Sequence, residues 1–101
     1  MTEQVLTTNH AGIFRLQINR PEKKNALTIA MYQAMTESLR AAEADPSVRV
    51  IMIAGTEACF TAGNDLADFL NNPPTGEDRP VFVFLKTLMA AQKPVVAVVH
   101  G

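Results

Sequence analysis

The sequence predicts an α/β protein built as one layered domain. Segments typical of strands and of helices alternate along its 101 residues, and such alternation is typical of α/β layers. This length suits a single domain. Apolar residues make up 48% of the chain and charged residues 19%, a balance that excludes a disordered or fibrous protein.

The first elements form a predicted hairpin. Residues 13–18 alternate between apolar and polar side chains, which indicates a half-buried strand. Residues 5–6 can pair with it through a turn at 9–12, where we expect His10 to be solvated. The strand pattern stops at Pro21, which has no N–H to donate. The face expected to be buried consists of Phe14, Leu16 and Ile18.

A helix is predicted next. Thr28 suits the N-cap and residues 45–46 (Asp-Pro) mark the stop. Between them, apolar residues recur at helical spacing and give one stripe. Met31 on the same helix, and Met52 further along the chain, are interpreted as core filling. The stripe consists of Tyr32, Met35, Leu39 and Ala42.

Residues 48–54 and 95–99 are nearly continuous apolar runs, which fit strands covered on both faces, as in parallel sheets. Residues 81–91 begin with a strand-like run, yet their apolar positions also fit a helical stripe with Pro80 near its first turn. We favour the helix, because the pattern continues into Lys-Thr-Leu-Met-Ala-Ala-Gln. This stripe consists of Val81, Phe84, Leu85 and Leu88.

The remaining segments are a short helix at 65–70 and a polar, turn-rich surface loop at 71–80. The apolar run 95–99 leads directly into residues 100–101, with no following element to cover or pair it. We therefore expect residues 1–101 to be the front part of a longer domain that is incomplete at the C-terminus.

Charge and composition exclude several classes of function. Nine Lys and Arg against ten Asp and Glu leave a net charge of −1, which argues against nucleic acid as the main partner. Cys59, the single cysteine, has no partner for a disulfide and is interpreted as buried and inert. We find no metal-ligand spacing, no signal peptide and no apolar run near the ~20 residues of a membrane span. A soluble, cytoplasmic protein is expected.

The candidate chemistry lies in residues 59–66. Their central Ala-Gly pair lets a ligand approach the backbone closely. A tight turn at 61–64, followed by a helix start, would point N–H groups outward, where they stabilise negative charge on an oxygen. The alternative is an ordinary strand-to-helix turn capped by Thr61 or Asp65.

Four motifs occur in order along the chain: Asn-Arg-Pro at 19–21, Lys-Asn-Ala-Leu at 24–27, Phe-Thr-Ala-Gly-Asn-Asp-Leu at 60–66, and Lys-Pro-Val-Val-Ala-Val-Val-His-Gly at 93–101. Together they resemble the crotonase superfamily, also called the enoyl-CoA hydratase/isomerase family. The Gly-Asn-Asp-Leu variant looks more like the Δ3,Δ2-enoyl-CoA isomerase branch than a typical hydratase. The resemblance implies the crotonase-like (ClpP/crotonase) ββα spiral, with this chain as its N-terminal portion.

The resemblance also implies roles for single residues. The backbone N–H of Asn64 would donate to the thioester oxygen of an acyl-CoA, as one donor of an oxyanion hole. Ala26 and Ala62 would lie against the adenine end of coenzyme A through backbone groups, and Lys24 would reach the phosphates. Asp65 and Leu66 would line the start of the acyl pocket. The implied binding set is Lys24, Ala26, Leu27, Ala62, Gly63, Asn64, Asp65 and Leu66.

The rest of the family's catalytic machinery does not match this chain. The second oxyanion donor and the catalytic carboxylates of the family come from segments that would lie beyond Gly101. Glu57 and Asp68 do not match the carboxylate positions, and we interpret His100 as structural. Residues 1–101 alone are therefore expected to show no hydratase or isomerase activity.

The resemblance implies the acyl-CoA-binding part of an enzyme of fatty-acid metabolism, either an enoyl-CoA hydratase (a lyase) or an isomerase. It would stabilise a thioester enolate while a carboxylate moves a proton. A coenzyme A thioester is the implied substrate, with no permanently bound cofactor, and a homotrimer or hexamer is the implied assembly. The alternatives are a non-catalytic CoA-binding or assembly module of the same fold, and an inactive partial chain ordered by packing with copies of itself.

Overall fold

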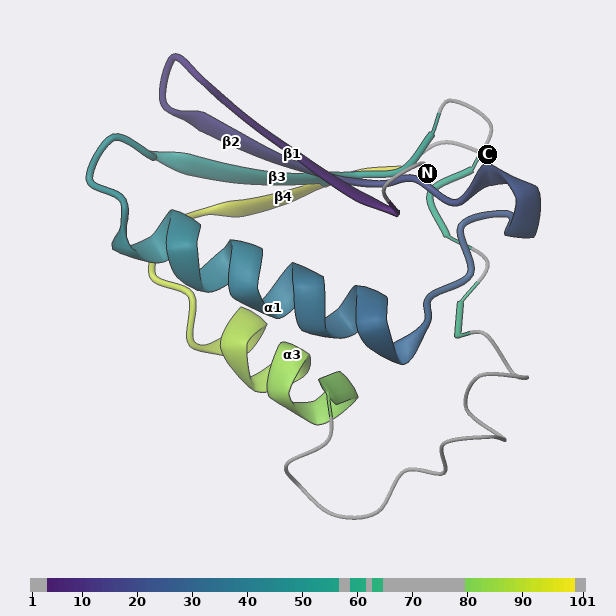
Figure 1. The fold of residues 1–101 in the computed structure, drawn as a ribbon. Coiled ribbons are helices and arrows are strands. Elements are labelled where there is room, and N and C mark those ends of the chain that lie inside the picture. The colour runs from purple at the N-terminus through teal and green to yellow at the C-terminus, as the bar shows by residue number, and fades with distance from the viewer. Residues whose placement is uncertain (1–3, 57–58, 62, 65–79, 100–101) are drawn as a thin grey trace.

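A computed structural model describes residues 4–56, 59–61, 63–64 and 80–99 (Figure 1). They form a four-stranded sheet in the order β1-β2-β3-β4, with both helices on one of its faces. The hairpin β1–β2 is antiparallel, and β3 and β4 add to it in parallel. This is the mixed α/β layer that the sequence predicts. The elements are β1 (Val5–His10), β2 (Ile13–Ile18), the 3₁₀ turn η1 (Pro21–Lys23), α1 (Ile29–Ala44), β3 (Val50–Ala54), α3 (Pro80–Met89) and β4 (Val95–Val98).

The β1–β2 hairpin turns in fewer residues than predicted. Ala11 and Gly12 have φ of 53° and 84°, and positive φ at both central residues is typical of a two-residue hairpin turn. The predicted turn at 9–12 is therefore too long, because Asn9 and His10 belong to β1. His10 is exposed, as expected. The alternation of β2 is confirmed, since Leu16 and Ile18 are buried against the helices.

Helix α1 begins and ends where the sequence predicts. The Oγ1 of Thr28 accepts a hydrogen bond from the Met31 N–H at 3.1 Å, which caps the helix N-terminus. Asp45 is the C-cap, directly before Pro46. All four residues of the predicted stripe are buried, and so is Met31. The helix therefore supplies one side of the hydrophobic core.

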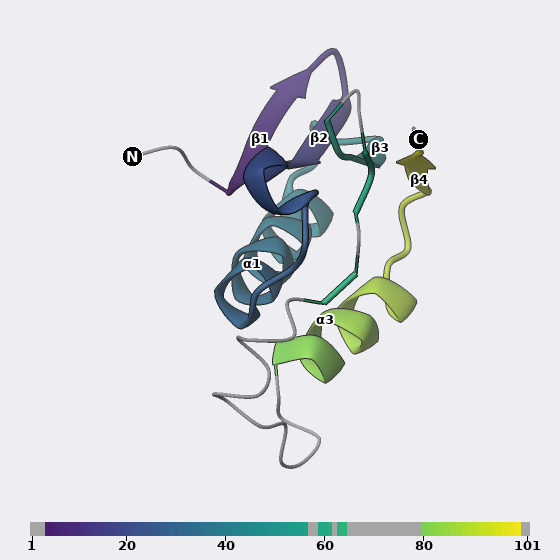
Figure 2. The same cartoon turned by 90° about the vertical axis from the view of Figure 1, so that its right-hand side faces the viewer.

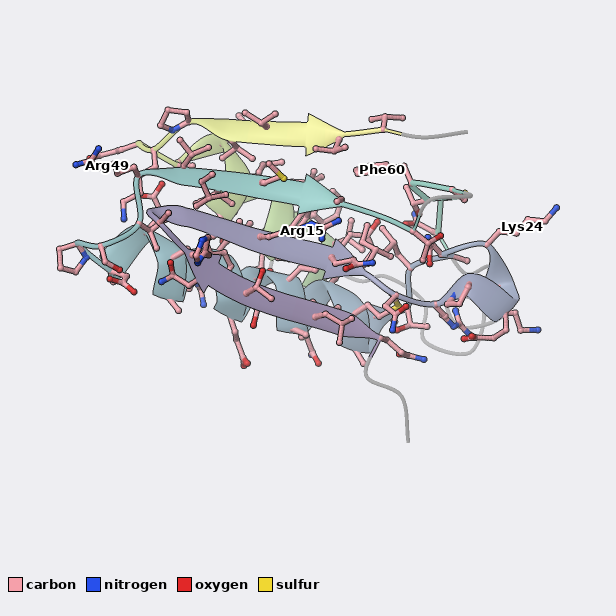
Figure 3. All side chains as sticks on the ribbon, turned by 90° about the horizontal axis from the view of Figure 1, so that it is seen from above. Arg15, Lys24, Arg49 and Phe60 are labelled. Atoms are coloured by element: carbon pink, nitrogen blue, oxygen red, sulfur yellow. The ribbon has the colours of Figure 1, made fainter. Side chains whose placement is uncertain are left out.

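The parallel arrangement of β3 and β4 is confirmed, but the predicted cover on both faces is not. Among the described residues, α1 and α3 pack on one face only, and Figure 3 looks down on the opposite face, where Arg15 lies on β2. Val50 and Met52 point to that face and are half-buried. The strand begins at Val50, not 48, because the Val48 N–H still bonds to the Asp45 carbonyl in the preceding turn. Continuous apolar sequence gives no indication of which face is covered here.

Helix α3 confirms the helical interpretation of residues 81–91. Val81, Phe84 and Leu88 pack against the core, whereas Leu85 is 44% exposed, contrary to the predicted stripe. Figure 2 shows α3 lying along α1 at the margin of the layer, which explains why its buried stripe is narrow.

The loop after α1 is tied to the segment that leads into β4. Lys93 donates its Nζ to the carbonyls of Ala42 and Asp45 at 2.7 and 2.6 Å. The Glu43 Oε1 accepts the N–H groups of Gln92 and Lys93 at 2.8 and 3.1 Å. Hydrogen bonds from the Ser47 side chain and backbone, with the Lys93 charge adding to them, hold the pKa of Asp45 below its usual value. This network fixes the start of β4 against the end of α1.

Several expectations concern residues outside the described ranges. The short helix at 65–70, nearly all of the loop at 71–80, and His100 belong to this group. In the part of the chain that is described, no helix is long and apolar enough to cross a membrane.

Candidate functional site

Three of the four sequence motifs lie in segments that meet beyond the carboxyl ends of β2 and β3. Residues 19–27 follow β2, and residues 55–64 follow β3. Because these strands are parallel neighbours, the segments that leave them emerge at the same edge of the sheet. Figures 1 and 2 show η1 beside the segment that follows β3. Motifs more than thirty residues apart in sequence thus build one site, as hydrogen bonds between Asn25 and Cys59 and between Leu27 and Gly63 attest.

Asn25 holds the two segments together. It is fully buried at 0% exposure, with φ of 59°, a left-handed conformation that asparagine tolerates well. Its Oδ1 accepts from the Arg20 N–H at 2.7 Å. Its Nδ2 donates to the Thr56 Oγ1 at 3.2 Å and the Cys59 carbonyl at 2.7 Å. Its own carbonyl accepts from the Thr61 Oγ1 at 2.6 Å. The sequence predicts no such role for Asn25, which occurs there only as part of the Lys-Asn-Ala-Leu motif.

The segment after β3 folds back closely on the end of the strand. Thr56 and Cys59 exchange backbone hydrogen bonds of 3.0 and 3.3 Å. A Cβ added to Gly55 would lie 2.3 Å from the Cys59 carbonyl oxygen, so only glycine fits there. The predicted turn at 61–64 includes residue 62, which lies outside the described ranges. Of its described residues, Gly63 donates its N–H to the Thr61 Oγ1 at 3.1 Å. Cys59 is half-buried, not buried as predicted, and its Sγ lies 3.4 Å from the Lys24 carbonyl.

The peptide between Gly63 and Asn64 has a defined orientation. Asn64 forms an isolated parallel bridge with Leu27, whose N–H donates to the Gly63 carbonyl at 2.8 Å. In a trans peptide the C=O and N–H point in opposite directions, so the Asn64 N–H is directed away from Leu27. Asn64 is exposed, and within the described ranges its N–H donates no hydrogen bond. A preorganised donor that has no acceptor in the described part of the chain suits an oxyanion.

Gly63 leaves the approach to that peptide open. It has φ of +100°, a conformation that favours glycine. A Cβ built on it would meet no heavy atom within 4 Å among the described residues other than its chain neighbours. This space agrees with the expectation that small residues here let a ligand approach the backbone.

The side chain of Asn64 is bound from the core side. The Tyr32 hydroxyl, on the first turns of α1, donates to the Asn64 Oδ1 at 2.5 Å. Tyr32 is 8% exposed, and its ring lies 5.5 Å from that of Phe84, centroid to centroid, at 60°. Burial raises the pKa of the Tyr32 hydroxyl, so it remains a protonated donor at neutral pH. Sequence reasoning places Tyr32 only in the core.

The other described members of the implied binding set lie around the same peptide. Lys24 is exposed in a left-handed conformation, and Figure 3 shows its side chain reaching outward beyond η1, at the same end of the sheet as Phe60. Ala26 donates its N–H to the Lys23 carbonyl at 3.0 Å, while its carbonyl accepts from the Arg20 Nη1 at 3.1 Å. Only the second lone pair of that carbonyl remains for a ligand.

Leu27 contributes its backbone, since its side chain is buried in the core. Three residues of the implied set, and both carboxylates considered in the sequence, lie outside the described ranges. No group of three His, Cys, Asp or Glu side chains in the described part of the chain can hold a metal ion. The residues outside are Ala62, Asp65, Leu66, Glu57 and Asp68.

Comparisons with known proteins identify relatives over the whole chain. The family model of enoyl-CoA hydratase/isomerase matches residues 8–101. Human enoyl-CoA delta isomerase 2 is 33% identical over an alignment that covers 98% of this chain and 27% of the relative. The 1,2-epoxyphenylacetyl-CoA isomerase of Escherichia coli K12 is 31% identical over an alignment that covers 100% of this chain and 41% of the relative.

The fold is also found in solved structures. OdaA of Pseudomonas aeruginosa superposes with a TM-score of 0.95 at 47% identity, over 99% of this chain and 40% of that protein. The chain thus spans between about a quarter and two fifths of the length of these relatives.

Proposed function

Because the chain belongs to the enoyl-CoA hydratase/isomerase family, of the crotonase superfamily, we propose that it forms the acyl-CoA-binding part of an enzyme that acts on the double bond of an enoyl-CoA thioester. The Asn64 N–H is the donor that this part contributes to an oxyanion hole. The observation that carries this proposal is the orientation of the Gly63–Asn64 peptide, set by the bond from the Leu27 N–H to the Gly63 carbonyl.

The chemistry needs such a donor at one atom. When a base removes a proton from the carbon next to the thioester carbonyl, the electron pair of the broken C–H bond moves into the C–C bond and the carbonyl becomes an enolate. The negative charge collects on the former carbonyl oxygen. A hydrogen bond that is already aimed at this oxygen stabilises the enolate more than the neutral thioester, which lowers the barrier. Returning the proton to another carbon then shifts the double bond.

Coenzyme A is proposed to lie along residues 24–27. Lys24 offers a cation for its phosphates, and Ala26 the free lone pair of its carbonyl for the adenine amino group. Ala62 is proposed to contribute to the same adenine contact, with Asp65 and Leu66 at the start of the acyl pocket. Lys24 carries its charge on an exposed side chain at the edge of the site, which supports this placement.

We propose double-bond isomerisation as the reaction, in preference to hydration. The relatives named above include an enoyl-CoA delta isomerase, and the Gly-Asn-Asp-Leu variant around Asn64 resembles that branch. The second oxyanion donor and the proton-transferring carboxylate are assigned to segments outside these residues. Residues 1–101 alone are then expected to bind acyl-CoA without turnover, and a trimeric or hexameric enzyme is proposed as the working assembly.

The test is to remove the proposed N–H in the full-length protein, expressed from its complete reading frame. Asn64→Pro deletes the N–H, whereas the matched control Asn64→Ala keeps it and changes only the side chain. We expect Asn64→Pro to lower kcat on 3-enoyl-CoA by ~10²–10³, the usual cost of one lost oxyanion donor, and well below Asn64→Ala.

Equal activity of the two variants would show that the N–H plays no part in catalysis. Activity of the wild-type protein only on 2-enoyl-CoA would replace isomerisation by hydration. Tight CoA binding with no turnover of either substrate would favour a non-catalytic binding module.

A further inference from the structure

We propose that Tyr32 is a positioning residue for the oxyanion donor and acts through the side chain of Asn64. The inference rests on the proposed function of the Asn64 N–H. Its observation is the 2.5 Å hydrogen bond from the Tyr32 hydroxyl to the Asn64 Oδ1, which connects the core to an exposed residue of the site. Tyr32 is buried and is proposed to act only through Asn64.

The core fixes the position of the Tyr32 hydroxyl independently of the site. Tyr32 lies one turn after the N-cap of α1, where the Thr28 Oγ1 accepts the Met31 N–H and so fixes the residue at which the helix begins. Its ring packs against Phe84 of α3, and it belongs to the same core cluster as Leu16 and Met35. A ring held on several sides presents its hydroxyl at one place, so it can serve as a fixed point for a less restrained segment.

The segment that carries the donor needs such a fixed point. Gly63 has φ of +100°, and among the described residues beyond its chain neighbours no heavy atom lies within 4 Å of the place a Cβ would take. Glycine is also the residue type whose backbone rotates most freely. On one side of the Gly63–Asn64 peptide, Leu27 fixes the Gly63 carbonyl. On the other side, the bond to Tyr32 fixes Asn64 itself. Loss of the hydroxyl leaves the peptide restrained at one end only.

Such a defect affects turnover more than binding. Misalignment of the N–H weakens its hydrogen bond to the enolate oxygen, where the negative charge is greatest, more than its hydrogen bond to the neutral thioester. Removing the Tyr32 hydroxyl should therefore lower kcat and leave KM nearly unchanged. The loss should be about tenfold, smaller than the ~10²–10³ for deleting a donor outright.

The experiment compares Tyr32→Phe with Thr36→Val in the full-length protein. Both remove one buried hydroxyl from α1, but the Thr36 Oγ1 donates to the Tyr32 backbone carbonyl at 2.9 Å and, among the described residues, has no bond to the site. We expect Tyr32→Phe to lower kcat about tenfold with KM within about twofold, and Thr36→Val to leave both unchanged. Asn64→Ala breaks the same bond from the exposed end and should reproduce the loss even if Tyr32→Phe folds poorly.

A double variant and a spectrum complete the test. If Tyr32 acts through Asn64, Tyr32→Phe combined with Asn64→Ala should be no slower than Asn64→Ala alone. Acetoacetyl-CoA bound to the wild-type protein should show the near-ultraviolet absorption of its enolate, weaker in Tyr32→Phe and unchanged in Thr36→Val. Additive losses of kcat in the double variant, or a Tyr32→Phe protein as active as Thr36→Val, would overturn the role of Tyr32 and leave the proposed function standing. A wild-type protein without turnover or enolate absorption would overturn the proposed function instead.

Discussion

At the scale of single residues, the site depends on groups that carry no reactive chemistry of their own. Asn25 uses its whole side chain to join two loops, and Gly55 is required because the Cys59 carbonyl occupies the space of a Cβ. Leu27 contributes one N–H that orients the Gly63 carbonyl. The proposed donor is therefore a backbone group whose direction is determined by the residues around it, and substitutions should be interpreted through their effect on that direction.

One prediction at this scale concerns Lys24. In the full-length protein, Lys24→Glu should weaken coenzyme A binding, because an attraction to phosphate becomes a repulsion. The effect should be modest, since an exposed charge pair is worth ~0.2–1 kcal/mol, and it should shrink as salt screens the charges. Titration calorimetry at low and high ionic strength measures both the size and the salt dependence.

Lys23→Glu is the matched control for Lys24→Glu, because Lys23 is also exposed and makes the same change in net charge one residue earlier. Its effect on affinity should be clearly smaller. Equal losses of affinity in the two variants would show that only the net charge of the molecule matters. Lys24 would then have no specific contact with the phosphates.

At the scale of elements, the sequence predicts the helix boundaries and the buried faces that follow from periodicity. It predicts little of the structure that depends on contacts between segments far apart in the sequence. The α1 boundaries follow from Thr28 and Pro46, and the buried face of β2 follows from alternation. The hydrogen bonds that Asn25 makes to Thr56 and Cys59 could not be predicted, because they join two loops that lie far apart in the sequence. The exposure of Leu85 depends on how far α3 overlaps α1, which its own stripe does not reveal. The bond from Tyr32 to Asn64 is likewise set by the tertiary fold.

The network at the end of α1 gives a second prediction. Lys93 is half-buried and donates to two carbonyls of that helix end, so it both caps the helix and anchors the segment before β4. In the full-length protein, Lys93→Met should reduce the free energy of unfolding by about 1–3 kcal/mol, as expected for lost hydrogen bonds from a charged group. Chemical denaturation measures this difference.

The comparison for Lys93→Met is Lys23→Met, which removes an exposed lysine charge from η1. In the ranges described, the Lys23 side chain has no recorded partner, so this variant should change stability by only a few tenths of a kcal/mol. If Lys93→Met unfolds at the same denaturant concentration as Lys23→Met, the two carbonyl contacts contribute nothing to stability.

At the scale of the whole molecule, the described residues form a sheet that helices cover on one face, with the candidate site at the carboxyl ends of β2 and β3. Both helices cover the same face of the sheet. Ile13 and Val96, which pair with Val50 and Met52 on the opposite face, are 42% and 47% exposed. The chain covers about two fifths of OdaA at a TM-score of 0.95, so the layer keeps the family fold over that share. The described parts of the motifs at 19–27 and 60–64 lie together at one edge of this layer. The order of the motifs in the sequence was sufficient to predict the family, whereas the donor role of Asn64 stays a prediction.

The measurement that tests the central claim most directly is a crystal structure of the full-length protein with acetoacetyl-CoA bound. We predict that the thioester oxygen lies ~2.7–3.1 Å from the Asn64 backbone nitrogen, with the Leu27 N–H still bonded to the Gly63 carbonyl. A thioester oxygen bound elsewhere, or an Asn64 N–H donating to another protein group in that complex, would contradict it.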